Sequence, residues 1–137
     1  MKHTSPTDEA GVSSRASGRT RWDSIRDAVR GVGWLVRSQR NARIHTVALC
    51  AAVGLAAGLR ISPVEWGLVL LCCGAVFAAE AFNTAIEELA DEVSTDHRVR
   101  LGRAKDVAAA GVLLTALASA SVGLCVFGPR LWSLLEG

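Results

Sequence analysis

Residues 66–91 read WGLVLLCCGAVFAAEAFNTAIEELAD, an apolar run that ends in carboxylates and an amide. At 3.6 residues per turn, the spacing i, i+3, i+7, i+11 places four polar side chains on one stripe of a helix: Glu80, Asn83, Glu87 and Asp91. The apolar part is long enough to enter a membrane. Ionisable side chains at membrane depth are costly and usually mark ion, proton or substrate chemistry. We therefore interpret this stripe as the functional surface.

The composition predicts an all-α integral membrane protein with one domain. Half of the 137 residues are apolar, which is too many for an ordinary soluble domain. Three apolar segments lie at residues 44–59, 66–82 and 107–127. The third has 21 residues without a charge, enough to cross about 30 Å of hydrocarbon. A soluble four-helix bundle is the alternative, but its buried helices rarely need so long an uncharged run.

The distribution of basic residues predicts the orientation in the membrane. Of the 15 Lys and Arg residues, nine precede the first apolar segment and four lie between the second and third. Only Arg60 and Arg130 lie elsewhere. By the positive-inside rule, the N-terminus and the second loop face the cytoplasm and the C-terminus lies outside. For a bacterial protein this places the chain in the inner membrane, and no nucleic-acid partner is expected.

The N-terminal region divides into a tail and an amphipathic helix. Residues 1–20 are rich in Ser, Thr, Gly and charge, which predicts a disordered cytoplasmic tail, and no secretory signal peptide is indicated. From residue 22 to 40, apolar residues recur every three or four positions while arginines occupy other faces. This pattern predicts a helix that lies on the cytoplasmic leaflet.

We expect residues 21–137 to form a single membrane domain with three spans, at about 43–60, 63–92 and 103–128. Between the first two spans, Ser62 can cap the next helix and Pro63 can begin it. The four cysteines lie in the expected spans, without a CxxC pair or a histidine at metal-ligand spacing. They are interpreted as small apolar side chains.

The acidic stripe and the start of the third span have the parts needed for phosphoryl transfer. Glu87 can hold a divalent cation such as Mg²⁺, which prefers oxygen ligands. Lys105 can neutralise phosphate charge, and Glu80 can accept the proton of a lipid hydroxyl. Neither GxxxxGK[ST] nor GxGxxG is present, so the site is not of the P-loop or protein-kinase kind. The alternatives are a solvated helix end for the acids and an ordinary helix start for Lys105.

These motifs resemble those of the prokaryotic diacylglycerol kinase and undecaprenol kinase family. The resemblance rests on EAFNTAIE with Asp91, on RAKDVAAA from residue 103, and on SIRDAVRG and SQRNARIH nearer the N-terminus. It implies a three-span membrane lipid kinase that works as a homotrimer with active sites shared between subunits. ATP is then the phosphate donor and Mg²⁺ the cofactor.

Carried over position by position, the resemblance gives each residue a role. Glu80 matches the proton acceptor and Glu87 a metal ligand. The positions that match polar or nucleotide contacts are Asn83, Lys105, Asp106, Asp96, His97 and Arg98. Where many relatives have a second metal-binding glutamate, this chain has Gln39, whose amide oxygen can bind Mg²⁺ but carries no charge.

The acceptor implied by the resemblance is undecaprenol or diacylglycerol. The motifs NTAIE and RNARIH are more similar to those of the undecaprenol branch of the family. We therefore favour undecaprenol as the acceptor. The alternative from another class is a non-enzymatic trimeric membrane protein, either an ion or proton pathway or an assembly subunit, that uses the same carboxylates.

Overall fold

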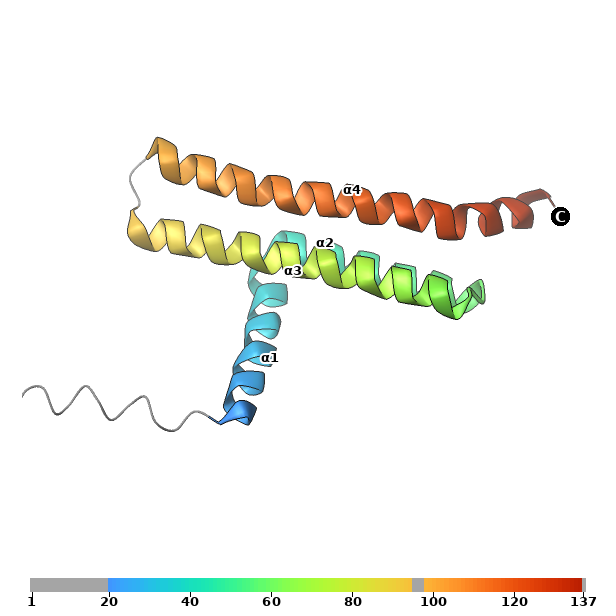
Figure 1. The fold of residues 1–137 in the computed structure, drawn as a ribbon, viewed down its shortest axis with the longest axis horizontal. Coiled ribbons are helices and arrows are strands. Elements are labelled where there is room, and N and C mark those ends of the chain that lie inside the picture. The colour runs from blue at the N-terminus through green and yellow to red at the C-terminus, as the bar shows by residue number, and fades with distance from the viewer. Residues whose placement is uncertain (1–19, 95–97, 137) are drawn as a thin grey trace, which may run out of the picture. The chain divides into compact units, whose positions relative to one another are not determined.

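The protein is a helical chain in the computed structural model, which describes residues 20–94 and 98–136. Over these residues it has four helices and no strand, so the all-α prediction is confirmed (Figure 1). The helices are α1 (Arg21–Ser38), α2 (Arg40–Gly58), α3 (Pro63–Val93) and α4 (Val99–Glu136). The contacts group the chain into two units, residues 1–33 and 34–137. The second unit contains α2, α3 and α4.

α1 begins with a reciprocal cap. The Thr20 backbone N–H donates to Asp23 Oδ2 at 3.0 Å, and the Asp23 N–H donates to Thr20 Oγ1 at 3.3 Å. The Thr20 hydroxyl also donates to Asp23 Oδ2, at 2.9 Å. The two bonds that the Asp23 carboxylate accepts, the one from the backbone above all, lower the pKa of Asp23 below its usual value. The apolar side chains on the three-and-four spacing are exposed: Trp22, Ile25, Val29 and Val32.

α2 follows α1 after one residue, Gln39, whose backbone is extended. Its polar start, with Arg40 and Arg43, gives way to a run of small apolar residues that ends at Gly58. The turn to α3 then passes through Arg60, which has φ 49° and is the one described non-glycine residue in the left-handed region.

α3 begins as the sequence predicts. Ser62 Oγ accepts from the Glu65 N–H at 3.4 Å, while the Ser62 N–H donates to Glu65 Oε2 at 2.7 Å. This capping box, followed directly by Pro63, confirms the predicted cap and helix start. The helix then continues for 31 residues through the whole polar stripe.

α4 is longer than the segment expected at 103–128. It begins at Val99 and continues past Pro129, although proline removes one helical hydrogen bond. Side-chain hydrogen bonds stabilise the turn at Pro129. The Arg130 guanidinium donates both to Glu65 on α3 and to the Val126 carbonyl.

Packing within residues 34–137 centres on α3, which packs mainly on α4 and less on α2. A small apolar core joins the three helices at the end where α3 begins: Ala56, Ile61, Val69, Val126 and Phe127. The polar stripe lies toward the other end of α3, beside the start of α4 (Figure 1).

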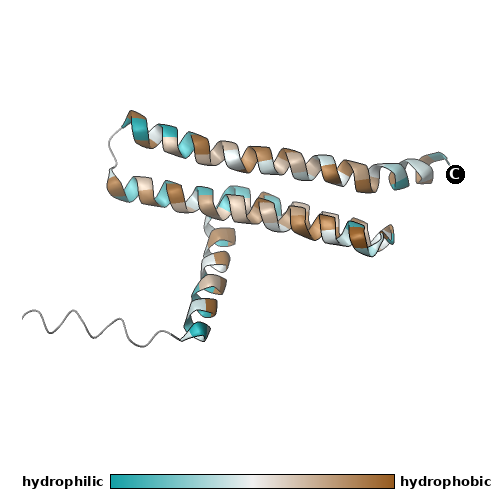
Figure 2. Ribbon diagram, viewed as in Figure 1, coloured by the Kyte–Doolittle hydropathy of each residue, from teal (hydrophilic) through white to brown (hydrophobic). Residues whose placement is uncertain are grey.

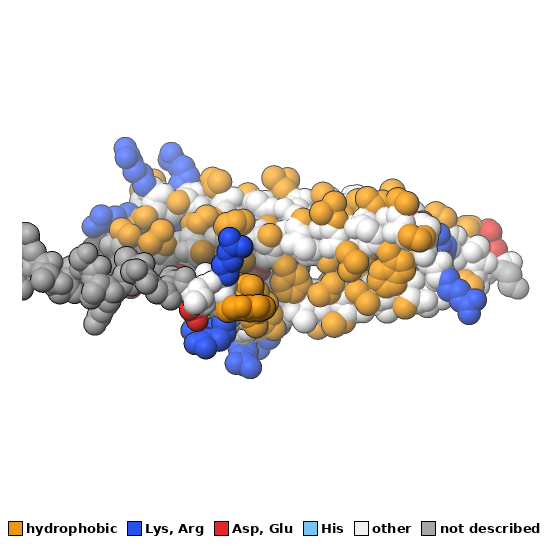
Figure 3. Space-filling model, turned by 60° about the horizontal axis from the view of Figure 1, so that its bottom comes forward, with side chains coloured by type: hydrophobic (Ala, Val, Ile, Leu, Met, Phe, Trp, Pro, Cys, Tyr) orange, Lys and Arg blue, Asp and Glu red, His pale blue; other side chains and the backbone are white. Residues whose placement is uncertain are grey.

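Two of the described helices, α3 and α4, are long and apolar enough to cross a membrane. Only 28% and 17% of their most apolar windows are buried, so these side chains do not form the core of a soluble bundle. Hydrophobic residues extend along both helices, and basic side chains gather toward their ends (Figures 2 and 3). α2, expected as the first span, is not among these two helices. Its first turns carry two arginines and a histidine.

Candidate active site

Three polar side chains are buried on consecutive turns of α3. Glu80, Asn83 and Thr84 are 2%, 5% and 3% exposed. The carboxylate of Glu80 is the largest fully buried side chain in the described residues. α3 brings these residues together because positions i, i+3 and i+4 share one face of a helix.

Each of these side chains has a buried oxygen without a partner among the described residues: Glu80 Oε2, Asn83 Oδ1 and Thr84 Oγ1. A buried polar atom left unpaired costs roughly 1–3 kcal/mol, and more when the group is charged. Native proteins rarely keep such atoms without a reason, which is often a catalytic role or a ligand. Three of them on one helix face indicate a binding site.

Glu87 lies one turn beyond this cluster. The Asn83 amide donates from Nδ2 to Glu87 Oε1 at 3.0 Å, which orients both side chains. Through this bond Glu87 is joined to the buried cluster on the same face of α3. The predicted stripe is therefore brought together as expected, with Glu80 buried at one end and Glu87 half-buried beyond it.

Lys105 connects α4 to the same stripe. Its Nζ lies 2.7 Å from Asp91 Oδ1, in an ion pair that joins the end of α3 to the start of α4. Glu87 and Glu88 add electrostatic interactions with the same ammonium group. The lysine is thus held beside the carboxylates, although the two helices are separated by a loop in sequence.

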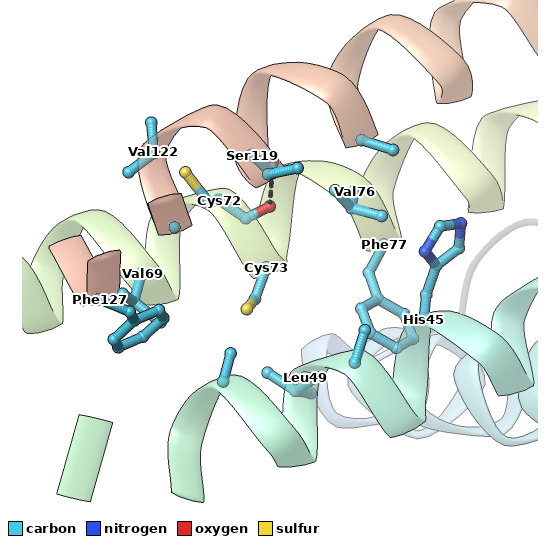
Figure 4. A pocket seen from close by; sticks show the side chains of 15 residues that line it. His45, Leu49, Val69, Cys72, Cys73, Val76, Phe77, Ser119, Val122 and Phe127 are labelled. Carbon is cyan, nitrogen blue, oxygen red and sulfur yellow. Dashed lines mark hydrogen bonds between the residues drawn. The ribbon is translucent and has the colours of Figure 1, made fainter. Parts of the chain in front are cut away.

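His45 is a residue near the site that sequence reasoning missed. It lies on α2 and lines a cavity together with Phe77, which is one turn before Glu80 on α3 (Figure 4). Thr84 was also missed, although it directly follows Asn83. A signal was available for His45, because a histidine near the start of an apolar segment can face the polar stripe of a neighbouring helix, but its partner is apparent only from the packing.

The remaining predicted residues are not joined to this cluster. Gln39 is half-buried between α1 and α2, and its side chain makes no cap hydrogen bond. Arg98 and Asp106 are exposed near the start of α4. Asp96 and His97 lie outside the described residues.

The donor chemistry fits a hard divalent cation. In the described residues no group of three or more His, Cys, Asp or Glu side chains could hold a metal ion by itself. Mg²⁺, however, is usually held by one or two carboxylates together with substrate phosphates and water. The Glu87 carboxylate and the unpaired buried oxygen of Asn83 are the hard oxygen donors that such an ion prefers.

These features define a class of protein: a helical membrane protein with a buried carboxylate that has an unpaired oxygen, and with a lysine ammonium group held beside the same polar stripe. Comparison with known proteins gives the family. Residues 26–127 match the model of the prokaryotic diacylglycerol kinase family, and the chain belongs to that family. It is a lipid kinase, and the resemblance seen in the sequence is confirmed.

Two relatives carry names that bear on the acceptor. The chain is 36% identical over 104 residues to an undecaprenol kinase of Bacillus subtilis, covering 76% of this chain and 85% of that protein. It is 36% identical over 113 residues to a diacylglycerol kinase of Synechocystis sp., covering 82% of this chain and 65% of that protein. A lipid kinase requires a lipid acceptor and a nucleotide donor, and membership of this family argues against the non-enzymatic alternative.

Proposed function

We propose that this protein transfers the γ-phosphate of ATP to the primary hydroxyl of a membrane lipid alcohol, with undecaprenol favoured over diacylglycerol. The observation that carries the proposal is the Glu80 carboxylate, buried with an unpaired oxygen on the same face as Asn83 and Thr84. The two relatives are equally identical to this chain, and their names give different acceptors. The preference for undecaprenol therefore rests on the motifs NTAIE and RNARIH.

In the proposed reaction, Glu80 accepts the proton of the lipid hydroxyl as the oxygen forms a bond to the γ-phosphorus. The bond between that phosphorus and the β–γ bridging oxygen breaks, and ADP leaves with the electron pair. Burial of Glu80 keeps bulk water away from the phosphorus, so transfer to the lipid is favoured over hydrolysis. Catalysis of this kind depends mainly on positioning and charge stabilisation.

Mg²⁺ is the proposed cofactor, and its proposed protein ligands are Glu87 and, although the described residues do not join it to Glu87, Gln39. When bound, it would neutralise charge on the phosphates during transfer. Asn83 keeps Glu87 in place through the hydrogen bond at 3.0 Å. Gln39 would add an oxygen without adding negative charge.

The nucleotide is proposed to lie between the stripe and the start of α4. Lys105 would contact phosphate oxygens, for which its ammonium group must leave or share Asp91. Asn83, Asp106 and Arg98 are the other proposed nucleotide contacts in the described residues. Asp96 and His97, which precede Arg98 in the sequence, are proposed to contact the nucleotide with it.

The membrane arrangement is also proposed. α2, α3 and α4 would be three spans, because the 19 residues of α2 reach roughly 28 Å at 1.5 Å per residue and basic residues flank its start. α1 would lie on the cytoplasmic leaflet through its exposed apolar side chains, with the N-terminus and active site inside and the C-terminus outside. A homotrimer with shared sites would supply groups that a single chain lacks.

The proposal is tested by giving purified protein labelled ATP and Mg²⁺ with undecaprenol or diacylglycerol in mixed micelles. Phosphorylated undecaprenol, formed faster than phosphorylated diacylglycerol at matched mole fractions, is the expected result. Reversed preference would replace the favoured acceptor. Failure to phosphorylate either lipid, in protein shown to be folded, would overturn the proposed reaction.

A further inference from the structure

The C-terminal segment of α4, residues 129–136, lies beyond the part of the chain that matches the family model. α4 has 38 residues and is roughly 57 Å long at 1.5 Å per residue, whereas the hydrocarbon core of a bilayer is about 30 Å thick. The uncharged run at 107–127 already fills that core. The C-terminal segment therefore continues out of the hydrocarbon, and it runs past the start of α3 (Figure 1).

The ion pair between Glu65 and Arg130 marks the level at which this segment leaves the hydrocarbon. The Arg130 guanidinium donates to both carboxylate oxygens of Glu65, at 2.8 Å each, and both side chains are partly exposed. Charged groups are costly in hydrocarbon, so the pair belongs at the membrane boundary. The pair also ties α4 to the first turn of α3. The residues after Arg130 consequently begin in the headgroup region.

The C-terminal segment nevertheless has a large apolar face. Four apolar side chains are exposed by 40% to 82%: Leu131, Trp132, Leu134 and Leu135. At 3.6 residues per turn they share an arc of about 160° around the helix. The polar side chains occupy the rest of the circumference: Arg130, Ser133 and Glu136. A contiguous apolar face of this kind is unfavourable in water and indicates an interaction surface.

We propose that the C-terminal segment is an amphipathic membrane anchor, with its three leucines and Trp132 inserted between the headgroups of the outer leaflet. The lipid that surrounds α4 as a membrane-spanning helix continues directly onto this segment. Pro129 lacks the N–H that would bond to the Cys125 carbonyl, which lets the last turns tilt toward the bilayer surface. Tryptophan is enriched at this depth, and amphipathic helices bind there through their apolar face.

The charge of the segment indicates what kind of lipid surface it needs. Arg130 and Glu136 are its only charged residues, so its net charge is zero, and Arg130 is already paired with Glu65. The anchor is therefore held by burial of apolar surface and not by attraction to anionic headgroups. The inference uses the proposed membrane topology, with the C-terminus outside, and does not depend on the proposed reaction.

The fluorescence of Trp132 tests the anchor in a bilayer. In the full chain with Trp22, Trp34 and Trp66 replaced by Phe, Trp132 is the only tryptophan. In phosphatidylcholine vesicles with bromine atoms on the acyl chains near the headgroups, its emission should fall by about half or more. Replacing part of the unbrominated lipid by phosphatidylglycerol should leave this loss unchanged.

The other outcomes of this measurement overturn the inference. Quenching by aqueous acrylamide without quenching by bromine would place the segment in water. Quenching by neither would mean that a second copy or another protein covers Trp132. A bromine effect that requires phosphatidylglycerol would mean that anionic headgroups hold the segment.

Two matched variants test whether one face of the segment contacts lipid. Leu135→Asp and Ser133→Asp add the same charge at exposed positions two residues apart, on opposite sides of the helix. In the single-tryptophan chain, Leu135→Asp should reduce the quenching of Trp132 by bromine severalfold, whereas Ser133→Asp should leave it unchanged. Equal effects of the two variants, or no effect of either, would contradict the proposed orientation.

Labelling of intact cells tests the leaflet without any aspartate in the apolar face. In a chain with all four native cysteines replaced by Ala, a small membrane-impermeant maleimide should label Ser133→Cys and should label Leu135→Cys severalfold more slowly. Labelling of neither would show that the segment is not outside, and equal rates would show that its apolar face is not covered by lipid. Because both experiments measure position rather than turnover, loss of the proposed kinase reaction would not affect them.

Discussion

Two carboxylates of α3, Glu65 near its start and Glu80 further along, have opposite surroundings. At the start of α3, Glu65 accepts two hydrogen bonds from Arg130, each 2.8 Å long, and a third from the Ser62 N–H. Fifteen residues further along the same helix, Glu80 is buried and its Oε2 has no partner in the described part of the chain. A carboxylate with all its partners within the chain stabilises the fold, whereas an unpaired one is available for a ligand or a proton.

The largest expected effect is at the unpaired end. Glu80→Gln removes the proposed proton acceptor and should lower turnover by ~10²-fold or more. Its thermal stability in detergent should be unchanged or higher, since an unpaired buried carboxylate is replaced by a neutral amide. Glu65→Gln is the matched control on the same helix and should keep most of its activity. Near-normal turnover of Glu80→Gln would eliminate the general-base role.

The next largest effect concerns Lys105, whose ammonium group is held beside the polar stripe of α3. Lys105→Met should raise KM for ATP by about tenfold or more, because charge-assisted bonds to phosphate are lost. Asp91→Asn should give a smaller change in the same parameter, since the ammonium group remains but is no longer held. Initial-rate kinetics over a range of ATP concentrations measure both. An unaltered KM for ATP in Lys105→Met would show that the lysine does not contact the nucleotide.

A substitution at Gln39 tests the comparison further, because it can add a negative charge to the proposed metal site. Gln39→Glu should lower the Mg²⁺ concentration for half-maximal activity severalfold, because a carboxylate binds the ion more strongly than an amide does. Gln39→Met, which removes the oxygen, should shift the requirement in the opposite direction. A Mg²⁺ titration that is the same in all three proteins would remove Gln39 from the metal site.

Loss of the ion pair between Glu65 and Arg130 should change the stability of the protein rather than its turnover. Arg130→Gln breaks the bidentate pair with Glu65 and leaves that carboxylate with its Ser62 partner alone. The apparent melting temperature should fall by a few degrees, while turnover well below that temperature stays close to the wild-type value. A large loss of turnover at low temperature would mean that this end takes part in the reaction after all.

The smallest expected effect is at the turn between α2 and α3. Arg60 has φ 49°, a left-handed conformation that costs a non-glycine residue on the order of 1 kcal/mol. Arg60→Gly should therefore raise the apparent melting temperature slightly, with no change in kinetics. Arg60→Ala removes the same charge but keeps a Cβ, so it should not be stabilising. Equal stability of the two variants would contradict the conformational explanation.

Local features of the fold were predictable because they depend on neighbouring residues. The helical nature of the chain, the Ser62 cap and the Pro63 start follow from periodicity and from side chains within one turn. The stripe from Glu80 to Asp91 follows from the 3.6-residue period. The continuation of α4 past Pro129 depends on a non-local contact, because Arg130 is tied to Glu65, 65 residues earlier in the chain.

The sequence by itself determined the helical class, the family and the residue types at the site, since these are encoded in composition, spacing and motif wording. Only the tertiary structure decided which of these residues meet. It brought Lys105 to Asp91, and it enclosed a cavity between three helices with His45 of α2 in its lining. The physical reason is that helix packing depends on contacts between segments far apart in the chain, and neither spacing nor propensity within one segment specifies them.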